Sequence, residues 1–202
     1  MKNTIKSALL AKRAEIESEC FCKIAIKGGY ENHIRDILYE GLEAVGEKDL
    51  DTEVNFTKGT RNRIDLVSGR KHNLKFLIEL GHNGTWQNPF NVVNHAIDDI
   101  NRAIDFKIKT KGIYTVSLLT NITEINEKET YRFRKSYLKG IIENSISNPT
   151  NLDKTIAFFK ALDPDVMHFK MITAWNGFKA EIHFFICGSF DKEIEKDDIL
   201  GK

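Results

Sequence analysis

The chain has 202 residues, of which 41% are hydrophobic and 29% are charged. That balance suits one α/β domain spanning residues 1–202, and it excludes a chain that is disordered throughout. With 30 basic and 29 acidic side chains, the formal net charge is only +1. Any nucleic-acid site must therefore come from a local cluster of basic residues rather than from the bulk charge.

The cysteine count and the hydropathy pattern indicate the compartment. Cys20, Cys22 and Cys187 are an odd number of cysteines, which argues against a disulfide framework and fits a reducing environment. No apolar run approaches the roughly 18 residues of a membrane span, and the first residues lack the apolar core of a signal peptide. We therefore expect a cytoplasmic protein that does not enter a membrane.

Two helices are predicted at the start of the chain. Residues 3–20 carry apolar side chains at loose helical spacing, and the glycine pair at 28 and 29 interrupts the pattern. A more regular apolar stripe runs from about Tyr30 to Val45, and Gly46 is placed to end that helix.

Strand patterns follow in the middle of the sequence. Residues 52–57, 61–67 and 74–81 are predicted to form three short strands, with a polar connection at 68–71. The third strand is the most apolar, which indicates a buried, central position in the sheet. The polar, glycine-containing segment 81–88 is then expected to form a loop beside the end of that strand.

Helices and strands alternate in the second half of the chain. Pro89 stands near the start of a helix, where a missing N–H leaves no hydrogen bond unmade. Asn176-Gly177 lies between two strand patterns and predicts a hairpin. The other expected elements are a strand at 112–119, helices at 127–146 and 151–162, and the hairpin strands at 166–174 and 178–187. Together the elements predict an α/β fold with a mixed central β-sheet flanked by helices.

Two acidic residues lie where apolar side chains are expected. Glu79 lies inside the apolar run 76–80, and Asp65 lies between Ile64 and Leu66. A buried carboxylate without a cation or a hydrogen-bond donor costs several kcal/mol, so each of these residues needs a partner. If the second and third strands pair antiparallel, the two carboxylates can converge, and two hard oxygen ligands on a rigid sheet suit Mg²⁺.

The same residues carry a resemblance to a known family. Arg63-Ile64-Asp65-Leu66-Val67, followed by Phe76-Leu77-Ile78-Glu79-Leu80-Gly81, resembles the PD-(D/E)XK nuclease superfamily over residues 28–120. The resemblance implies a restriction-endonuclease-like fold, with helices and a hairpin at 126–190 added to the nuclease core. It implies an endonuclease that hydrolyses DNA with Mg²⁺ or Mn²⁺, and a homodimer, since many restriction enzymes are dimers. The metal ligands that it implies are Asp65, Glu79 and, on the preceding helix, Glu31.

One departure from the family motif affects catalysis. Gly81 stands where the family has a lysine that orients the attacking water and stabilises developing charge. Arg63, on the strand face of Asp65, and His82, just after the third strand, are two candidates to replace it. If neither does, the fold is kept as a catalytically inactive module that binds nucleic acid or protein. The expected catalytic residues are Asp65, Glu79, Arg63 and His82.

Basic and aromatic residues flank the acidic pair. Six basic residues fall between positions 58 and 75, opposed by Asp65 alone, and such a cluster can follow a phosphate backbone. In the loop at 81–88, Trp86 could stack on a base or, alternatively, pack into the core. The acidic pair also has an alternative explanation, a structural ion-pair cluster with neighbouring basic residues. The expected nucleic-acid contacts are Arg61, Arg70, Lys71, Trp86 and Gln87.

Overall fold

A computed structural model describes most of the chain. The described residues are 1–27, 30–54, 63–70, 73–84, 88–105, 110–124, 150–196 and 199. The strands are β1 (Leu50–Val54), β2 (Ile64–Arg70), β3 (Asn73–Gly84), β4 (Ile113–Glu124), β5 (Met167–Trp175) and β6 (Phe178–Phe190). The helices are α1 (Lys2–Ala11), α2 (Arg13–Ile16), α3 (Glu19–Lys27), α4 (Glu31–Ala44), α5 (Pro89–Asp105) and α8 (Thr150–Leu162).

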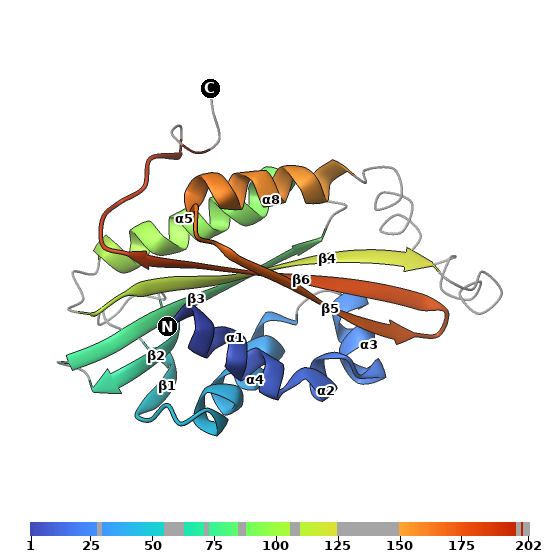
Figure 1. The fold of residues 1–202 in the computed structure, drawn as a ribbon, viewed down its shortest axis with the longest axis horizontal. Coiled ribbons are helices and arrows are strands. Elements are labelled where there is room, and N and C mark those ends of the chain that lie inside the picture. Colours follow the sequence, from blue (N-terminus) through green and yellow to red (C-terminus); the bar gives the residue numbers. More distant parts are fainter. Residues whose placement is uncertain are drawn as a thin grey trace.

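The strands form a single six-stranded sheet in the order β1-β2-β3-β4-β6-β5. β3 and β4 run parallel, and the other neighbouring strands are antiparallel. The helices α1 to α4 cover one face of the sheet, whereas α5 and α8 cover the other (Figure 1). The predicted α/β class, with a mixed central sheet flanked by helices, is therefore confirmed.

Alternation along β3 decides which residues face which helix layer. Phe76, Ile78 and Leu80 are buried in the core that also contains residues of α1 and α4. Leu77 belongs to a second cluster with Ala103 of α5. Because successive side chains of a strand point to opposite faces, residues 77, 79 and 81 all face the α5 layer. The fold thus directs Glu79 towards α5.

The helical predictions are confirmed in part. α4 and α8 match the expected helices at 30–45 and 151–162, and α5 begins at Pro89 as expected. The single helix expected at 3–20 is wrong, because the backbone leaves helical geometry at Lys12 and Glu17. The Ser18 hydroxyl then accepts the N–H of Phe21 at 3.2 Å and so caps the start of α3. The helix expected at 127–146 lies outside the described residues.

Two expected connections belong to strands instead. Ser68, Gly69 and Arg70 form the end of β2, where a register shift between Ser68 and Gly69 is accommodated by the left-handed φ of +103° at Gly69. Residues 81–84 belong to β3, because parallel pairing with residues 117–120 of β4 provides partners for their backbone groups. The first four residues of the predicted loop are therefore part of the strand.

The C-terminal hairpin forms as predicted. Asn176 and Gly177 join β5 to β6 with φ of 46° and 80°, the positive values that favour Asn-Gly in two-residue hairpin turns. The three cysteines are free thiols, in agreement with the prediction of no disulfide. Among the described helices, none has the length and apolar character needed to cross a membrane.

Candidate functional site

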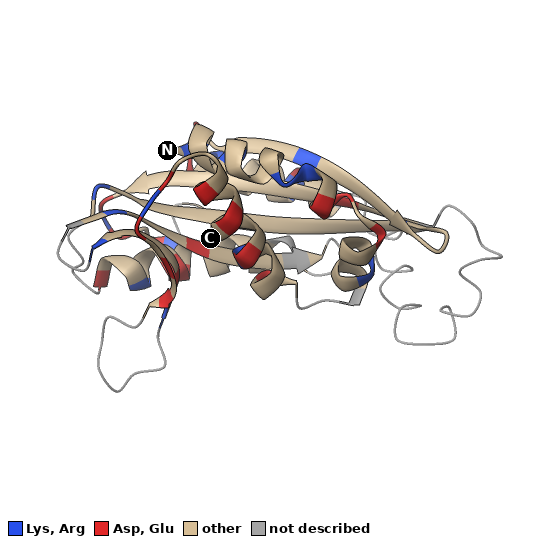
Figure 2. Cartoon of the chain, turned by 90° about the horizontal axis from the view of Figure 1, so that it is seen from below, with Lys and Arg blue, Asp and Glu red and all other residues tan. Residues whose placement is uncertain are grey.

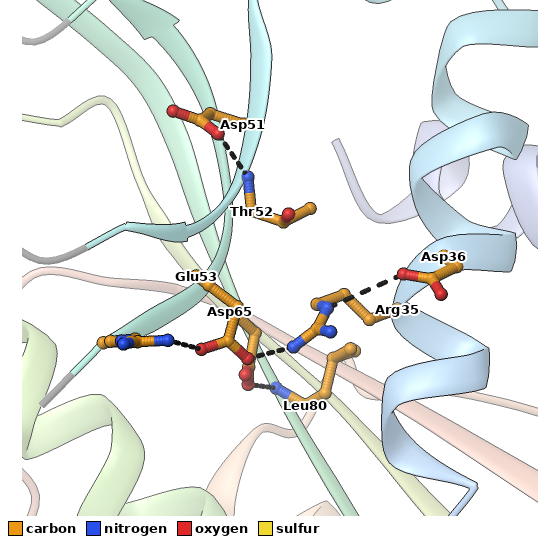
Figure 3. Close-up of polar contacts among 8 residues, drawn as sticks. Arg35, Asp36, Asp51, Thr52, Glu53, Asp65 and Leu80 are labelled. Atoms are coloured by element: carbon orange, nitrogen blue, oxygen red, sulfur yellow. Dashed lines mark hydrogen bonds and ion pairs between the residues drawn. The ribbon is translucent and has the colours of Figure 1, made fainter. Parts of the chain in front are cut away.

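The pairing between β2 and β3 ends within the sheet. Leu66 and Ile78 are the last paired residues at this end, although β3 continues to Gly84. Beyond that pair the Oδ2 atom of Asp65 accepts the N–H of Leu80 at 2.7 Å, as Figure 3 shows. A side-chain carboxylate thus takes the place of a backbone carbonyl where the two strands separate. The antiparallel pairing that the sequence predicted brings position 65 opposite Glu79.

Glu79 is a buried acid with an incomplete set of partners. Its side chain is 0% exposed, and Nη2 of Arg102 on α5 lies 3.1 Å from its Oε1 atom. Neither carboxylate oxygen accepts a hydrogen bond of normal geometry from the described residues. Arg102 also lies 2.9 Å from Oδ1 of Asp99, one turn earlier on α5. One guanidinium is therefore shared between two carboxylates.

Burial shifts the acid groups of this cluster towards their neutral forms. Burial raises the pKa of Glu79 to about 9, an effect that Arg102 opposes and that the charges of Asp65 and Asp99 reinforce. Burial likewise raises the pKa of Asp99 to about 7 and raises that of Asp65, which the N–H of Leu80 opposes. Three carboxyl groups thus compete for the positive charge of Arg102, and the cluster can hold a further cation.

Glu31 and His82 meet on the other face of β3. Oε2 of Glu31, in the first turn of α4, lies 3.0 Å from Nδ1 of His82. The His82 ring packs against the ring of Tyr30, with the two ring centroids 4.9 Å apart. The charge of Glu31 raises the pKa of both Asp65 and Asp99. Glu31 therefore acts electrostatically on the cluster while its carboxylate contacts His82.

Arg63 is held by a different acid. Its Nη1 atom lies 3.1 Å from Oε2 of Glu53, whose other oxygen forms an ion pair with Arg35 of α4. Figure 3 shows Arg35 and Glu53 directed towards one another beside Asp65. The side chain of Arg63 is 56% exposed. The role of Arg63 as a replacement for the missing lysine stays a prediction, as does that of His82.

The residues expected to contact nucleic acid are described only in part. Arg70 is exposed at the end of β2. Basic and acidic residues are interspersed along the described helices and strands (Figure 2). Arg61, Lys71, Trp86 and Gln87 lie outside the described residues.

Sequence reasoning did not identify Arg102 as part of this site. The predicted acidic residues lie on neighbouring strands, whereas Arg102 comes from the helix that follows β3. The available signal was the spacing of Asp99 and Arg102, three residues apart on a helix beside the buried Ile100 and Ala103. Charged side chains at that edge of an apolar stripe can reach a buried acid on the sheet beneath.

The metal-binding capacity of the cluster depends on few ligands. Among the residues that the structure describes, no three His, Cys, Asp or Glu side chains are grouped as a set of metal ligands. Mg²⁺ needs only one or two carboxylates, because it keeps several of its waters. Asp65 and Glu79, whose oxygens accept no hydrogen bond of normal geometry from the described residues, supply that number of carboxylates.

Comparison with known proteins adds no relative. No protein-family model matches the chain, and neither a curated protein nor a solved structure matches it.

Proposed function

We propose that this protein is a Mg²⁺- or Mn²⁺-dependent nuclease that hydrolyses phosphodiester bonds of DNA at Asp65 and Glu79. The observation that carries the proposal is the Glu79 carboxylate, which is fully buried and accepts no hydrogen bond from the described residues. Burying such a group costs several kcal/mol unless a cation or donors compensate. A divalent cation beside Asp65 would compensate for it.

The arrangement of elements supports the same proposal. From α4 to β4 the order is helix, three antiparallel strands, helix and a strand parallel to the third. This is the order that the resemblance to PD-(D/E)XK nucleases implies, with the two acids on the second and third strands. A restriction-endonuclease-like fold is therefore part of the proposal.

The residues of the chain would divide the chemical work. When bound, the metal ion supplies a Lewis acid that polarises a phosphate and activates a water. Asp65 is oriented by the N–H of Leu80, and Glu79 is fixed in the centre of the sheet, so both ligands are preorganised. Glu31, placed beside His82, would assist from the opposite face of β3.

The proposed reaction consumes one water molecule. Its oxygen forms a bond to phosphorus, while the bond from phosphorus to one nucleoside oxygen breaks. The water loses a proton to the solvent, and the departing oxygen takes up a proton. The products are a phosphate monoester and a free hydroxyl, with no oxidation or reduction.

A cleavage assay with plasmid DNA tests the proposal. Wild-type protein is expected to nick or linearise the plasmid with Mg²⁺ or Mn²⁺ and not with a chelator. Asp65→Asn and Glu79→Gln remove the charge of each proposed ligand at nearly constant volume and should leave no detectable cleavage. Glu181→Gln is the matched control, because Glu181 contacts Lys170 and Lys179 rather than the acidic cluster. Cleavage that persists in Asp65→Asn would contradict the proposal.

A second candidate function is a catalytically inactive nuclease fold that binds nucleic acid or protein. Two observations favour it, the absence of a lysine at Gly81 and the partial neutralisation of Glu79 by Arg102. It predicts no cleavage with either metal and equal DNA binding by wild type and Asp65→Ala, measured by fluorescence anisotropy of a labelled duplex.

A further inference from the structure

An open space lies beside Glu79, at Gly81. A Cβ atom added to Gly81 would meet no atom of the described residues within 4 Å, although the residue is buried in β3. Gly81 is two residues beyond Glu79, so the added atom would point to the same face of the sheet, towards the α5 layer. The space therefore lies on the same face of β3 as the Glu79 carboxylate.

Arg102 connects this buried acid with the solvent. Its Nη2 atom contacts both Glu79 and Asp99, at 3.1 and 2.9 Å, while its side chain is 36% exposed. Its Nε atom is buried and has no hydrogen-bond partner among the described residues. A guanidinium carries five N–H donors in a planar fork, and these two acids contact only one of its nitrogens. Arg102 thus retains donors for a ligand.

The other candidates for the missing lysine lack this placement. Arg63 pairs with Glu53 on β1, and His82 pairs with Glu31 on the opposite face of β3. Of the basic side chains that the structure describes, Arg102 alone lies within ion-pair distance of Glu79. The position of the charge, rather than its place in the sequence motif, distinguishes Arg102 from them.

We infer that Arg102 replaces the missing lysine and binds the scissile phosphate in the space beside Gly81. This inference rests on the proposed nuclease function and names a further catalytic residue for it. A guanidinium matches the geometry of a phosphate and stabilises charge as the phosphorus–oxygen bond breaks. It keeps its proton throughout, so the proton of the attacking water goes to the solvent.

Moving the charge from Arg102 to position 81 tests the inference. Arg102→Gln keeps a donor near Glu79 and removes the charge, and its cleavage rate is expected to fall about 10²–10³-fold. Adding Gly81→Lys to Arg102→Gln puts a cation into the open space. The cleavage rate of this double variant should be at least about tenfold higher than that of Arg102→Gln. Adding Gly81→Met instead gives a side chain of similar length without charge, and it should recover nothing.

Binding measurements separate this role from a structural one. The Mn²⁺ affinity of Arg102→Gln, measured by calorimetry, is expected to equal or exceed that of wild type, because Arg102 competes with the ion for Glu79. Its affinity for a short DNA duplex, measured by anisotropy, should decrease. A merely structural Arg102 would weaken Mn²⁺ binding, and Gly81→Lys would not reverse that loss.

Two results would overturn the inference while leaving the proposed function intact. One is a folded Arg102→Gln variant that cleaves at the wild-type rate, and the other is equal cleavage by the Gly81→Lys and Gly81→Met double variants. If Arg102→Gln is unfolded, Arg102→Lys is compared with Gly81→Lys/Arg102→Lys, and the double variant must then be faster. Wild-type protein that cleaves no DNA with either metal would overturn the proposed function and this inference together.

Discussion

Two buried carboxylates in this fold have opposite surroundings. Asp163, just after α8, is 9% exposed, and its Oδ2 atom lies 2.6 Å from Nζ of Lys2 on α1. Its two oxygens also accept the backbone N–H groups of Asp165 and Gly188, at 3.0 and 2.9 Å. Glu79 is more deeply buried, and among the described residues its one ion pair is with Arg102.

The difference separates structural acids from candidate ligands. Asp163 is fully satisfied, and it links the first helix to the segment between α8 and β5, so its role is to hold elements together. Glu79 pairs only with Arg102 among the described residues, a guanidinium that it shares with Asp99, and the burial of its carboxyl group opposes folding. Burial alone therefore does not mark a functional acid, whereas burial without donors does.

The largest effect is expected when the satisfied acid is removed. Asp163→Ala removes the acceptor of two backbone N–H groups and the ion-pair partner of Lys2, and we expect a loss of about 3 kcal/mol in the free energy of unfolding. Glu79→Leu should lose less than about 1 kcal/mol in a chelating buffer, because burial of the carboxyl group opposes folding and Arg102 keeps its contact with Asp99. Urea unfolding measures both, and equal losses would remove the contrast between the two acids.

Metal binding should stabilise the protein through Glu79 and not through Asp163. With Mn²⁺ at about 100 times its dissociation constant, the free energy of unfolding of the wild type should rise by about 2.7 kcal/mol. Glu79→Gln should abolish that gain, and Asp163→Asn should retain it. The check is a set of thermal melts with and without Mn²⁺, and a gain that survives in Glu79→Gln would place the ion elsewhere.

The stability of the metal-free protein should depend on pH through Glu79. Because its pKa rises from an ordinary 4.5 to about 9 on folding, the folded state binds the proton more tightly, and stability falls as the pH rises through that window. Glu79→Gln removes this effect. The free energy of unfolding of wild type relative to Glu79→Gln should therefore be about 2.7 kcal/mol lower at pH 8 than at pH 6.

A second acid provides a control of opposite sign. Lys179 and Lys170 lower the pKa of Glu181, whose contribution is therefore present above its ordinary pKa and lost in acid. Glu181→Gln should accordingly destabilise the protein at neutral pH and have no effect well below that pKa. Urea unfolding across the pH range measures both variants, and parallel curves for Glu79→Gln and wild type would contradict the assignment.

The smallest effect concerns Asp99. It contacts Arg102 rather than the oxygens of Glu79, so it orients the guanidinium without belonging to the proposed ligand pair. Asp99→Asn should weaken Mn²⁺ binding by about tenfold or less. Calorimetric titration measures this, and a loss as large as that of Asp65→Asn would make Asp99 a ligand.

Local sequence signals predicted the elements but not how they are combined. The regular stripe at 30–45, Pro89 and Asn176-Gly177 each fix a local conformation, and the corresponding elements formed. The continuation of β3 through Gly84 depends on parallel pairing with β4, which no local signal records. The pairing of β4 with β6 likewise joins segments far apart in the chain.

The candidate site divides in the same way. Asp65 and Glu79 could be placed opposite one another because antiparallel strands have a regular register. Arg102 could not, because the rotation of α5 over the sheet follows from the packing of its whole apolar face, including Val93, Ile97 and Ile100. Side chains that converge from different layers require the packed structure.

The separation of β2 from β3 has a spectroscopic consequence. The amide of Leu80 donates a hydrogen bond to the side chain of Asp65, so its proton resonance should report on the state of that carboxylate. Protonation of Asp65, or its recruitment by a metal ion, would weaken this hydrogen bond and shift the resonance upfield with faster solvent exchange. One backbone amide in the middle of β3 can thus serve as an NMR probe of the acidic pair, without any label at the site itself.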